Sequence, residues 1–322
     1  MFKSLRALCV ALVFALAFGA HALAAGPKTQ VPGYYRMQIG QIQVTAVFDG
    51  AIDIDTALLH NAAPEELNRL LARMFVGNPK MPTAVNAYVV DTGREVLLID
   101  TGMGGFRGPT LGHIEENLRA AGYEPGQIDK VLLTHIHSDH IGGLTDAAGV
   151  ARFPKAVVLV AQEEAAYWLS PENAAAAPKG KQPSFALARN MTAPYIASGR
   201  WQTFAMGATL APGVRAEPTV GHTPGHTAYA IESDGQKLLI VGDLLHAHAV
   251  QFARPGVSID FDVDQRKAIA TRRAVLKAVA AEGCLMGGMH LPFPGVGHVR
   301  AEGEDAYAWV PVEYTPALPA AK

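Results

Sequence analysis

The alternation of apolar and polar positions along the chain predicts a mixed α/β protein. Residues 41–47 alternate polar with apolar side chains, as in a strand with one face in solvent. Short apolar stretches are typical of strands buried on both faces, because neighbouring layers cover them. Strands are predicted on these grounds at 85–90, 95–99, 131–133, 156–160, 214–218, 228–232, 237–241 and 284–286.

Helical spacing of apolar residues places helices between these strands. Residues 64–75 carry apolar side chains three or four positions apart behind a Pro-Glu-Glu start, which favours a helix N-terminus. A helix over 111–121 is expected to be closed by the glycine that follows it. Further helices are expected at 162–169 and 264–281, whereas the alanine run 174–177 is expected in a loop. Strands that alternate with helices predict sheets covered by helices.

The first 24 residues have the three-part plan of a secretory signal peptide. Lys3 and Arg6 precede an apolar run at 7–20, and Ala-Leu-Ala at 22–24 is a small-residue cleavage signal. The alternative is an uncleaved membrane anchor. A membrane-spanning helix needs roughly 20 apolar residues, and this run is shorter. We expect residues 1–24 to be removed. The remaining chain, 25–322, is expected to be one exported domain, periplasmic or secreted, without a further membrane segment.

Charge and cysteine content exclude several classes of protein. The chain has 27 Lys and Arg against 29 Asp and Glu, a net charge of −2, so it lacks the basic excess of a nucleic-acid-binding protein. Two cysteines cannot supply a zinc ribbon or a disulfide framework. Cys9 lies in the apolar N-terminal run, and Cys284 is expected to be buried in its strand. The hydrophobic content of 49% indicates a folded chain and leaves room for a homodimer interface.

A glycine-rich segment at 100–108 follows a predicted strand but does not match a nucleotide-binding motif. A dinucleotide fingerprint needs a third glycine three residues after the second, and Arg107 stands at that position. The phosphate-binding pattern GxxxxGK is also absent from the sequence. The glycines are better explained by a tight turn.

The densest cluster of metal-binding side chains follows the strand 131–133. It contains His135, His137, Asp139 and His140. His135 and His137 are two positions apart, so they can point the same way where the strand ends, and the other two can reach the far side of the same pocket. Imidazole and carboxylate together suit divalent ions such as zinc. Polar surface-loop residues are the alternative, but four such side chains at this spacing favour a metal site.

Three further clusters lie where other predicted strands end. They are Gly-His-Thr-Pro-Gly-His-Thr at 221–227, Gly-Asp at 242–243, and the segment 288–295, which contains His290. Loops at strand ends gather at one edge of a sheet, and sites in α/β proteins form there. We therefore expect the four clusters to converge.

The order of these motifs resembles that of the metallo-β-lactamase-fold hydrolases. The matching motifs are His-x-His-x-Asp-His at 135–140, Gly-His-Thr-Pro-Gly-His at 221–226, Gly-Asp at 242–243, and the late His290. The resemblance spans roughly residues 35–314. It implies an α/β fold, the αββα sandwich of this family, with a dinuclear metal site at one edge.

The chain resembles the methyl parathion hydrolase group more closely. This resemblance rests on segments 242–245, 249–252 and 290–298, on the ending 309–312, and on the signal peptide. It implies a dinuclear metal-dependent hydrolase in which a metal-bridged hydroxide attacks phosphotriesters, organophosphates such as methyl parathion. A lactonase or broad ester hydrolase with the same metal site is the alternative. The expected partner is a small-molecule ester or lactone substrate.

The resemblance also implies a ligand set for two divalent ions. It comprises His135, His137 and His222 for one ion, Asp139, His140 and His290 for the other, and Asp243 as the bridge. The two carboxylates, Asp139 and Asp243, are expected to be catalytic. Zn²⁺ is the expected metal, with Mn, Co or Fe as alternatives. His226 is expected outside the ligand set, and Asp100 is expected to orient ligand histidines through their free ring nitrogen.

A neutral aryl ester would need an apolar pocket with aromatic walls. Aromatic residues near the motif loops are the candidates, with ordinary core packing as the alternative: Phe106, Trp168, Phe185 and Phe252. His246 and His248 follow the bridging aspartate closely. They either enter the substrate pocket and make it more polar, or alternate along a surface strand.

Other activities of the same fold agree less well with the sequence. A glutathione thioesterase would be expected to carry several basic residues after His290, where only Arg300 and Lys322 are found. A β-lactamase does not normally use a bridging aspartate, and a nuclease conflicts with the acidic balance and with export. From another class, a mononuclear-iron persulfide dioxygenase needs fewer ligands. A non-catalytic binding protein of this fold would be expected to lack some of them.

Overall fold

The structure is a computed structural model that describes residues 30–106, 108 and 110–315. The predicted signal peptide, residues 1–24, lies outside the described residues, so it stays a prediction. The described residues from Pro32 onward form one unit by their contacts, and the architecture is that of this unit.

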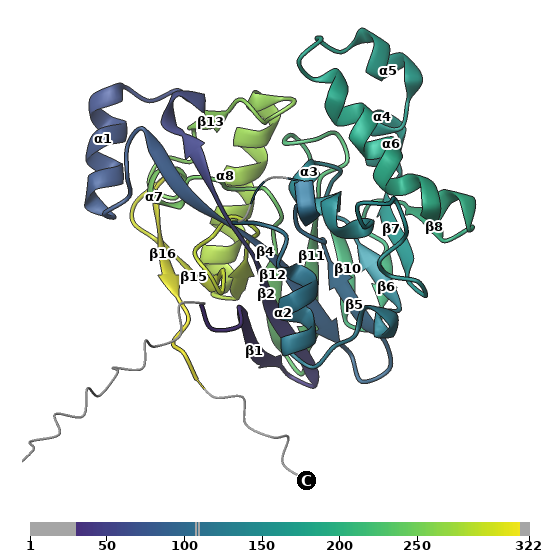
Figure 1. Cartoon of the computed structure of the whole chain (residues 1–322). Coiled ribbons are helices and arrows are strands. Elements are labelled where there is room, and N and C mark those ends of the chain that lie inside the picture. Colours follow the sequence, from purple (N-terminus) through teal and green to yellow (C-terminus); the bar gives the residue numbers. More distant parts are fainter. Residues whose placement is uncertain (1–29, 107, 109, 316–322) are drawn as a thin grey trace, which may run out of the picture. The chain divides into compact units, whose positions relative to one another are not determined.

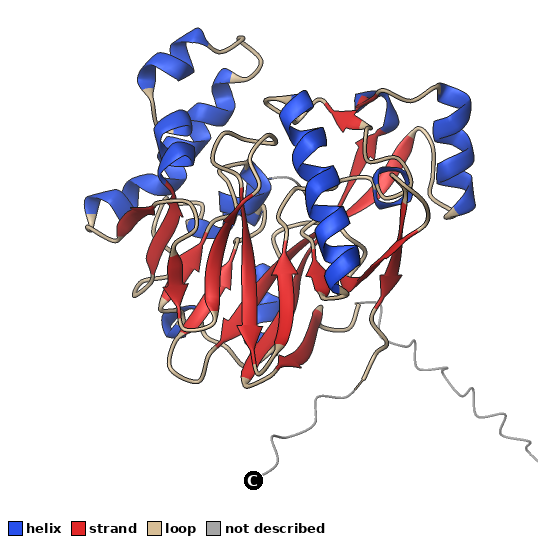
Figure 2. Ribbon diagram, turned by 180° about the vertical axis from the view of Figure 1, so that it is seen from behind, coloured by secondary structure: helices blue, strands red, loops and turns tan. Residues whose placement is uncertain are grey.

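Two seven-stranded sheets form the centre of the unit, and helices cover their outer faces (Figures 1 and 2). In spatial order the first sheet contains β1 (Tyr34–Ile39), β2 (Ile42–Asp55), β4 (Lys80–Asp91), β5 (Val96–Ile99), β6 (Lys130–Leu132), β7 (Val157–Ala161) and β8 (Trp201–Phe204). The second contains β16 (Tyr307–Pro311), β15 (Val296–Ala301), β14 (Leu285–Gly287), β12 (Gln236–Ile240), β11 (Thr227–Ser233), β10 (Val214–Pro218) and β9 (Thr209–Ala211). A separate two-stranded ladder pairs β13 (Ser258–Ile259) with β3 (Leu59–His60).

The described part of the chain contains eight α-helices and four short 3₁₀ turns. The α-helices are α1 (Pro64–Arg73), α2 (Ile114–Ala120), α3 (Ser138–Ile141), α4 (Gln162–Trp168), α5 (Pro171–Ala176), α6 (Gln182–Ala197), α7 (His248–Gln251) and α8 (Gln265–Glu282). Short 3₁₀ turns are η1 (Thr56–Leu58), η2 (Gly104–Phe106), η3 (Pro125–Gln127) and η4 (Gly142–Leu144).

Three apolar layers confirm the αββα sandwich. Side chains of both sheets, such as Ile99 and Ile240, form one buried cluster between the sheets. A second cluster joins the outer face of the first sheet to α2, α4 and α6, with Leu118 and Phe185 among its members. A third joins the second sheet to α8 through Leu276. Each sheet thus buries both faces, which explains the continuous apolar strands of the sequence.

Parallel pairing in each sheet creates one common edge for the functional loops. β5 and β6 are parallel, with Ile99 opposite Leu132. β12 and β14 are also parallel, with Ile240 opposite Gly287. Parallel strands end at the same edge of a sheet, so the segments after these four strands emerge as neighbours.

Local sequence signals explain where the predicted helices start and end. Pro64 occupies the first turn of α1, where its missing N–H costs no helix bond. The side chain of Asp264 caps α8 by accepting the backbone N–H of Lys267, and Gly283 closes the same helix in the left-handed conformation at φ 68°. The predicted helices at 64–75 and 264–281 are therefore confirmed to within a few residues.

Two predictions about local structure were wrong. The alanine run lies largely in α5, because Ser170 caps this helix by accepting the N–H of Asn173 and Pro171 opens it. Cys284 is only half-buried and precedes β14, which begins one residue later. The long helix α6 was not predicted; its interior contains Pro194, which sequence reading treats as a helix breaker.

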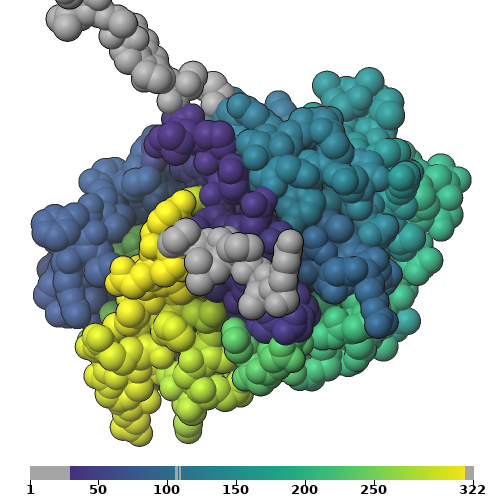
Figure 3. Space-filling view, turned by 90° about the horizontal axis from the view of Figure 1, so that it is seen from below, coloured from purple at the N-terminus to yellow at the C-terminus, as the bar shows by residue number. Residues whose placement is uncertain are grey.

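The first and last described strands come together at one face of the unit. Figure 3 shows the purple N-terminal strands beside the yellow C-terminal segment, and the rings of Tyr35 and Tyr314 lie 5.4 Å apart. None of the helices in the described part of the chain has the length and hydrophobicity that a membrane span requires.

Candidate metal centre

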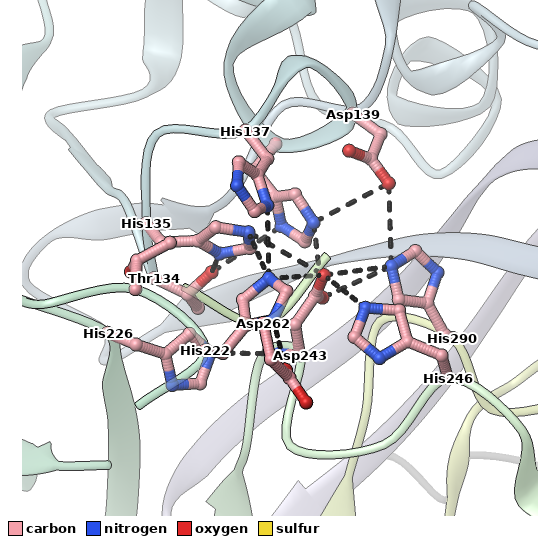
Figure 4. Close-up of polar contacts among 12 residues, drawn as sticks. Thr134, His135, His137, Asp139, His222, His226, Asp243, His246, Asp262 and His290 are labelled. Atoms are coloured by element: carbon pink, nitrogen blue, oxygen red, sulfur yellow. Dashed lines mark hydrogen bonds and ion pairs between the residues drawn. The ribbon is translucent and has the colours of Figure 1, made fainter. Parts of the chain in front are cut away.

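Loops from both sheets bring the predicted metal-binding side chains together at the common edge (Figure 4). The loop after β6 and helix α3 supply four of them, the loop before β11 supplies the fifth, and the segments after β12 and β14 supply one each. In chain order they are His135, His137, Asp139, His140, His222, Asp243 and His290. The expected convergence of the four motif clusters is thus present in the structure.

Three imidazoles form the first group of the cluster. His222 Nε2 lies 3.2 Å from His135 Nε2 and 3.0 Å from His137 Nδ1. One atom from each ring, together with a carboxylate oxygen of Asp243, lies within 4.8 Å of all the others. This is the spacing of donor atoms around a single cation.

A carboxylate and two imidazoles form the second group. Asp139 Oδ2 lies 3.6 Å from His140 Nε2 and 3.4 Å from His290 Nε2. His140 and His290 are buried, whereas Asp139 remains partly exposed. The exposed side of this group is where a substrate can approach.

Asp243 lies between the two groups: Oδ1 faces the second group, whereas Oδ2 lies close to members of both, including His290 Nε2 at 3.2 Å. Its Oδ1 is 3.1 Å from His140 Nε2 and 3.1 Å from His290 Nε2. Its Oδ2 is 3.3 Å from His222 Nε2 and 3.5 Å from His135 Nε2. Its two oxygens are thus placed where the carboxylate could contact a cation held by either group.

The donor chemistry of the cluster fits two divalent cations. His140 Nε2 and Asp243 Oδ1 are buried and have no hydrogen-bond partner among the described residues. Such unpaired polar atoms are costly in a protein interior, and a cation between them would satisfy both. Imidazole and carboxylate are also the donors that zinc and related ions bind in hydrolytic sites.

Burial and mutual contact shift the pKa values across the cluster. Burial, followed by the neighbouring imidazoles, holds the pKa of His135 and His137 well below its usual value. Burial opposes protonation of His222 as well, yet its hydrogen bonds to Asp243 and Asp262 raise its pKa to about 9. Metal binding would therefore have to displace a proton from His222, because only the neutral ring offers a lone pair.

Three of the ligand imidazoles form a hydrogen bond through the ring nitrogen that points away from the ligand cluster. His140 Nδ1 lies 2.7 Å from Asp100 Oδ2, as expected from the sequence. His222 Nδ1 lies 2.9 Å from Asp262 Oδ1, and His290 Nδ1 donates to the carbonyl of Ala84 at 2.8 Å. Such partners set ring orientation and tautomer and raise the basicity of the metal-facing nitrogen.

His226 lies behind the cluster. Its Nε2 accepts the backbone N–H of Asp243 at 2.9 Å, so the proton is on Nδ1, which donates to the carbonyl of Thr219 at 3.0 Å. Burial, with the nearby His222, lowers its pKa to about 3, so the ring stays neutral. His226 thus holds the segment that carries Asp243.

Sequence reading missed three buried residues that position the ligand loops. Glu164 accepts the N–H of Ile136 at 2.9 Å, the hydroxyl of Thr223 at 2.7 Å and the N–H of Gly225 at 2.8 Å. Asp262 was missed because it lies in a loop outside the motifs. Arg272 on α8 is fully buried and lies 3.7 Å from Asp262, and it donates to three backbone carbonyls.

The cluster forms one side of a cavity of about 700 Å³. Five of the lining side chains are those of His137, Asp139, Asp243, His246 and His290. Helices α4 and α6 contribute Tyr167, Trp168 and Phe185, and β2 with the segment after β13 contributes Ile52, Ile54, Phe261 and Val263. The rings of Trp168 and His137 meet edge-on with their centroids 5.2 Å apart, so the aromatic lining contacts the cluster of ligand side chains.

The remaining pocket candidates have different outcomes. Phe252 was wrongly assigned: it packs in the core under α8 and stacks on Trp309 at 5.4 Å, away from the cavity. Of Phe106 only the backbone turn η2 is described. His248 is partly buried at the start of α7 and is absent from the described cavity lining, whereas His246 belongs to that lining.

The comparisons with known proteins identify the family. The sequence profile of the Metallo-beta-lactamase superfamily matches residues 81–282, and the chain belongs to this superfamily. An atrochrysone carboxyl ACP thioesterase of Passalora fulva is 31% identical over 221 residues, which are 67% of this chain and 55% of the thioesterase. The chain spans about half the length of the curated relatives that it matches.

Two solved structures are similar over most of the chain. A hydrolase of the beta-lactamase superfamily, AbOPH, has a TM-score of 0.86 at 36% identity and covers 89% of this chain and 100% of its own. AidC, a dizinc quorum-quenching lactonase in complex with the product N-hexanoyl-L-homoserine, has a TM-score of 0.82 at 26% identity. It covers 88% of this chain and 99% of its own.

Proposed function

We propose that this protein is a dinuclear metal-dependent hydrolase of small uncharged esters, with aryl phosphotriesters such as methyl parathion as its preferred substrates. One observation carries the proposal: four of the seven ligand-type side chains, those of His137, Asp139, Asp243 and His290, line a cavity whose remaining walls are largely apolar and aromatic. The ions are proposed to be Zn²⁺. Residues 1–24 are proposed to direct export of the enzyme.

The proposed roles of the residues follow from the geometry. When bound, two divalent cations supply hydroxide at neutral pH and polarise the ester oxygen. Asp243 lies against both ligand groups, so its carboxylate would contact both ions. Asp139, the partly exposed carboxylate, faces the cavity beside His290. Cys284 lies before β14 and is absent from the described cavity lining, so it is not assigned a role.

The preference for uncharged aryl substrates rests on the cavity lining. Apart from histidines, Lys181 is the only basic side chain among its described residues, and it is exposed. An anionic substrate would find little further positive charge once the ions are in place. Trp168 and Phe185 offer aromatic surface beside His137, which suits a planar leaving group. The 36% identity to AbOPH, a hydrolase of the beta-lactamase superfamily, supports the hydrolase class.

Lactone hydrolysis is the second candidate. The similarity to the lactonase AidC favours it, because that likeness extends over nearly the whole of both chains. The apolar lining from β2 and the segment after β13 would also accept an acyl chain. A thioester substrate is suggested only by relatives that this chain matches over about half their length.

The decisive experiment compares kcat/KM of one metal-loaded preparation on methyl parathion, an N-acyl homoserine lactone and an acyl thioester, with a chelated control. We expect the phosphotriester to exceed the others by more than about tenfold, which corresponds to about 1.4 kcal/mol of transition-state preference. A lactone that is hydrolysed faster than the phosphotriester would overturn the substrate assignment and leave the hydrolase class intact. A preparation holding a single iron and hydrolysing none of the esters would overturn the class itself.

A further inference from the structure

The ring of His246 lies inside the ligand cluster, although the family motifs do not include it (Figure 4). Its Nε2 is 3.0 Å from Asp243 Oδ2. The ring stacks on that of His290, with centroids 4.9 Å apart and planes at 24°, and lies 5.0 Å from that of His222. Ligand atoms of Asp243, His246 and His290 all lie within 4.8 Å of one another, and all three residues are buried.

The spacing of His246 from Asp243 matches that of the ligand histidines. The Nε2 atoms of His222 and His290 lie 3.3 Å and 3.2 Å from the same oxygen, Asp243 Oδ2. Tetrahedral zinc with bonds of about 2.0–2.1 Å to nitrogen places neighbouring donor atoms roughly 3.3 Å apart. The distance from His246 Nε2 to Asp243 Oδ2 therefore fits two arrangements. In one the two atoms bind the same ion, and in the other they share a hydrogen bond.

A buried glutamine fixes the backbone that presents this ring. Gln251 Oε1 accepts the N–H of His246 at 2.7 Å and that of Ala247 at 3.0 Å. Its Nε2 donates to the carbonyl of Val257 at 3.0 Å. Gln251 is fully buried, so the position of the 246–247 backbone is set by the fold rather than by solvent.

Electrostatics favour coordination over a hydrogen bond once the centre is loaded. When both oxygens of Asp243 bind cations, an Nε2–H group of His246 beside Oδ2 would point its positive end toward a cation. The other tautomer presents the Nε2 lone pair there instead, and a lone pair is attracted to the ion. In a loaded centre, the 3.0 Å distance between His246 Nε2 and Asp243 Oδ2 therefore fits metal coordination by His246 better than a hydrogen bond donated by its ring.

We propose that His246 is an eighth protein ligand of this metal centre, binding through Nε2 to the ion that it shares with Asp243 and His290. The inference rests on the metal centre of the proposed function, but its test needs no substrate. Nδ1 of His246 has no hydrogen-bond partner among the described residues, in contrast to the rings that Asp100 and Asp262 fix. We therefore expect its bond to the ion to be the weakest of the set.

The test measures metal retention directly. Zinc-loaded wild type, His246→Ala and His248→Ala are titrated with a chelator, and bound zinc per chain is determined by elemental analysis. His248 is the matched control, because it is a nearby, partly buried histidine that does not line the cavity. We expect His246→Ala to lose one ion at a chelator concentration about tenfold lower than wild type, and His248→Ala to behave as wild type.

A second variant tests whether His246 acts as a metal ligand or as a hydrogen-bond donor to Asp243. His246→Gln can place an amide N–H near Asp243 Oδ2 but binds zinc poorly, so it should lose metal as the alanine variant does. The visible spectrum of the cobalt-substituted protein should change in both variants, because the coordination of one ion changes. Retention of both ions with an unaltered cobalt spectrum in His246→Ala would overturn the proposal, as would full rescue by glutamine. Failure of the wild type to hydrolyse any ester would contradict only the proposed function.

Discussion

The carboxylate of Glu164 accepts the backbone N–H of Gly225 at 2.8 Å, which joins helix α4 to the loop that carries His222. Its other oxygen accepts the N–H of Ile136 at 2.9 Å, between His135 and His137. One buried side chain therefore fixes two loops that supply all the imidazoles of the first ligand group. Burial raises the pKa of Glu164, although its three hydrogen bonds act in the opposite direction.

Replacing this carboxylate should weaken metal binding. In Glu164→Gln one acceptor oxygen becomes an NH₂ group, so at least one buried donor loses its partner. We expect the affinity for one ion to fall by about 10- to 100-fold, the usual effect of removing a residue that orients ligands. Chelator competition measures this affinity. Glu163→Gln, at the exposed neighbouring position, is the control and should bind metal as wild type does.

The close approach of Gly225 to α4 predicts a steric effect. A Cβ at this position would lie 2.2 Å from the backbone nitrogen of Glu164. Gly225→Ala should therefore lower the free energy of unfolding by about 1–3 kcal/mol, as overpacking of a well-packed interior does. Gly126→Ala, where nothing lies within 4 Å, should leave it nearly unchanged. Equal denaturation midpoints for the two variants would contradict the packing seen here.

The contact between Asp262 and His222 predicts a charge effect on the ligand. Asp262→Asn preserves the shape of the side chain but removes the negative charge beside His222 Nδ1. We expect metal affinity to fall by about 10- to 100-fold while the fold is retained. Asp305→Asn, which removes a surface carboxylate paired with Arg273, is the control. An affinity equal to that of wild type would show that the carboxylate charge is dispensable.

Metal removal should lower thermal stability reversibly. A cation that binds only the folded state adds about 2.7 kcal/mol at 100 times its Kd, and for a domain of this size that shifts Tm by roughly 4–5 °C. Treatment with a chelator should lower Tm by this amount, and added zinc should restore it. His222→Ala should lose most of this metal-dependent gain, because the first ligand group is then incomplete. A zinc response of normal size in this variant would argue against the ligand assignment.

The aromatic lining predicts a specificity change at Trp168. Trp168→Leu keeps an apolar side chain but removes the ring beside His137. The ratio of kcat/KM for methyl parathion to that for an aliphatic lactone should fall about threefold to tenfold, which corresponds to the roughly 0.5–1.5 kcal/mol of an aromatic contact. Phe252→Leu, in the core beside Trp309, should lower stability without changing this ratio.

Much of the fold and of the ligand cluster could be predicted from the sequence. Strands of a covered sheet are continuous apolar stretches, so β5, β6 and β12 were visible as patterns. The ligands lie within a few residues of one another in short motifs, so their order alone pointed to the family. The comparisons confirm the superfamily and the fold, whereas the aryl phosphotriester assignment stays a proposal.

The supporting residues could not be predicted, because their role depends on tertiary contacts. Glu164 is one of two adjacent glutamates in the first turn of a helix, and only the packing of Gly225 against it shows which one is buried. Phe252 was misassigned because its position near Asp243 in the sequence suggested the cavity, whereas α7 directs it into the core. His246 sits three residues after Asp243, and a turn at that point returns its ring to the same carboxylate.

One turn of helix α4 contains both a residue that supports the ligand loops and a residue that lines the cavity. Glu164 holds the ligand loops, and four positions later Trp168 lines the cavity and contacts His137. Substitutions selected on this helix for a new substrate would therefore disturb the metal ligands as well. Phe261 and Val263 line the same cavity but are partly exposed. Adaptation to new esters should accordingly begin at Phe261 and Val263, and changes in α4 should become tolerable only after other substitutions have raised stability.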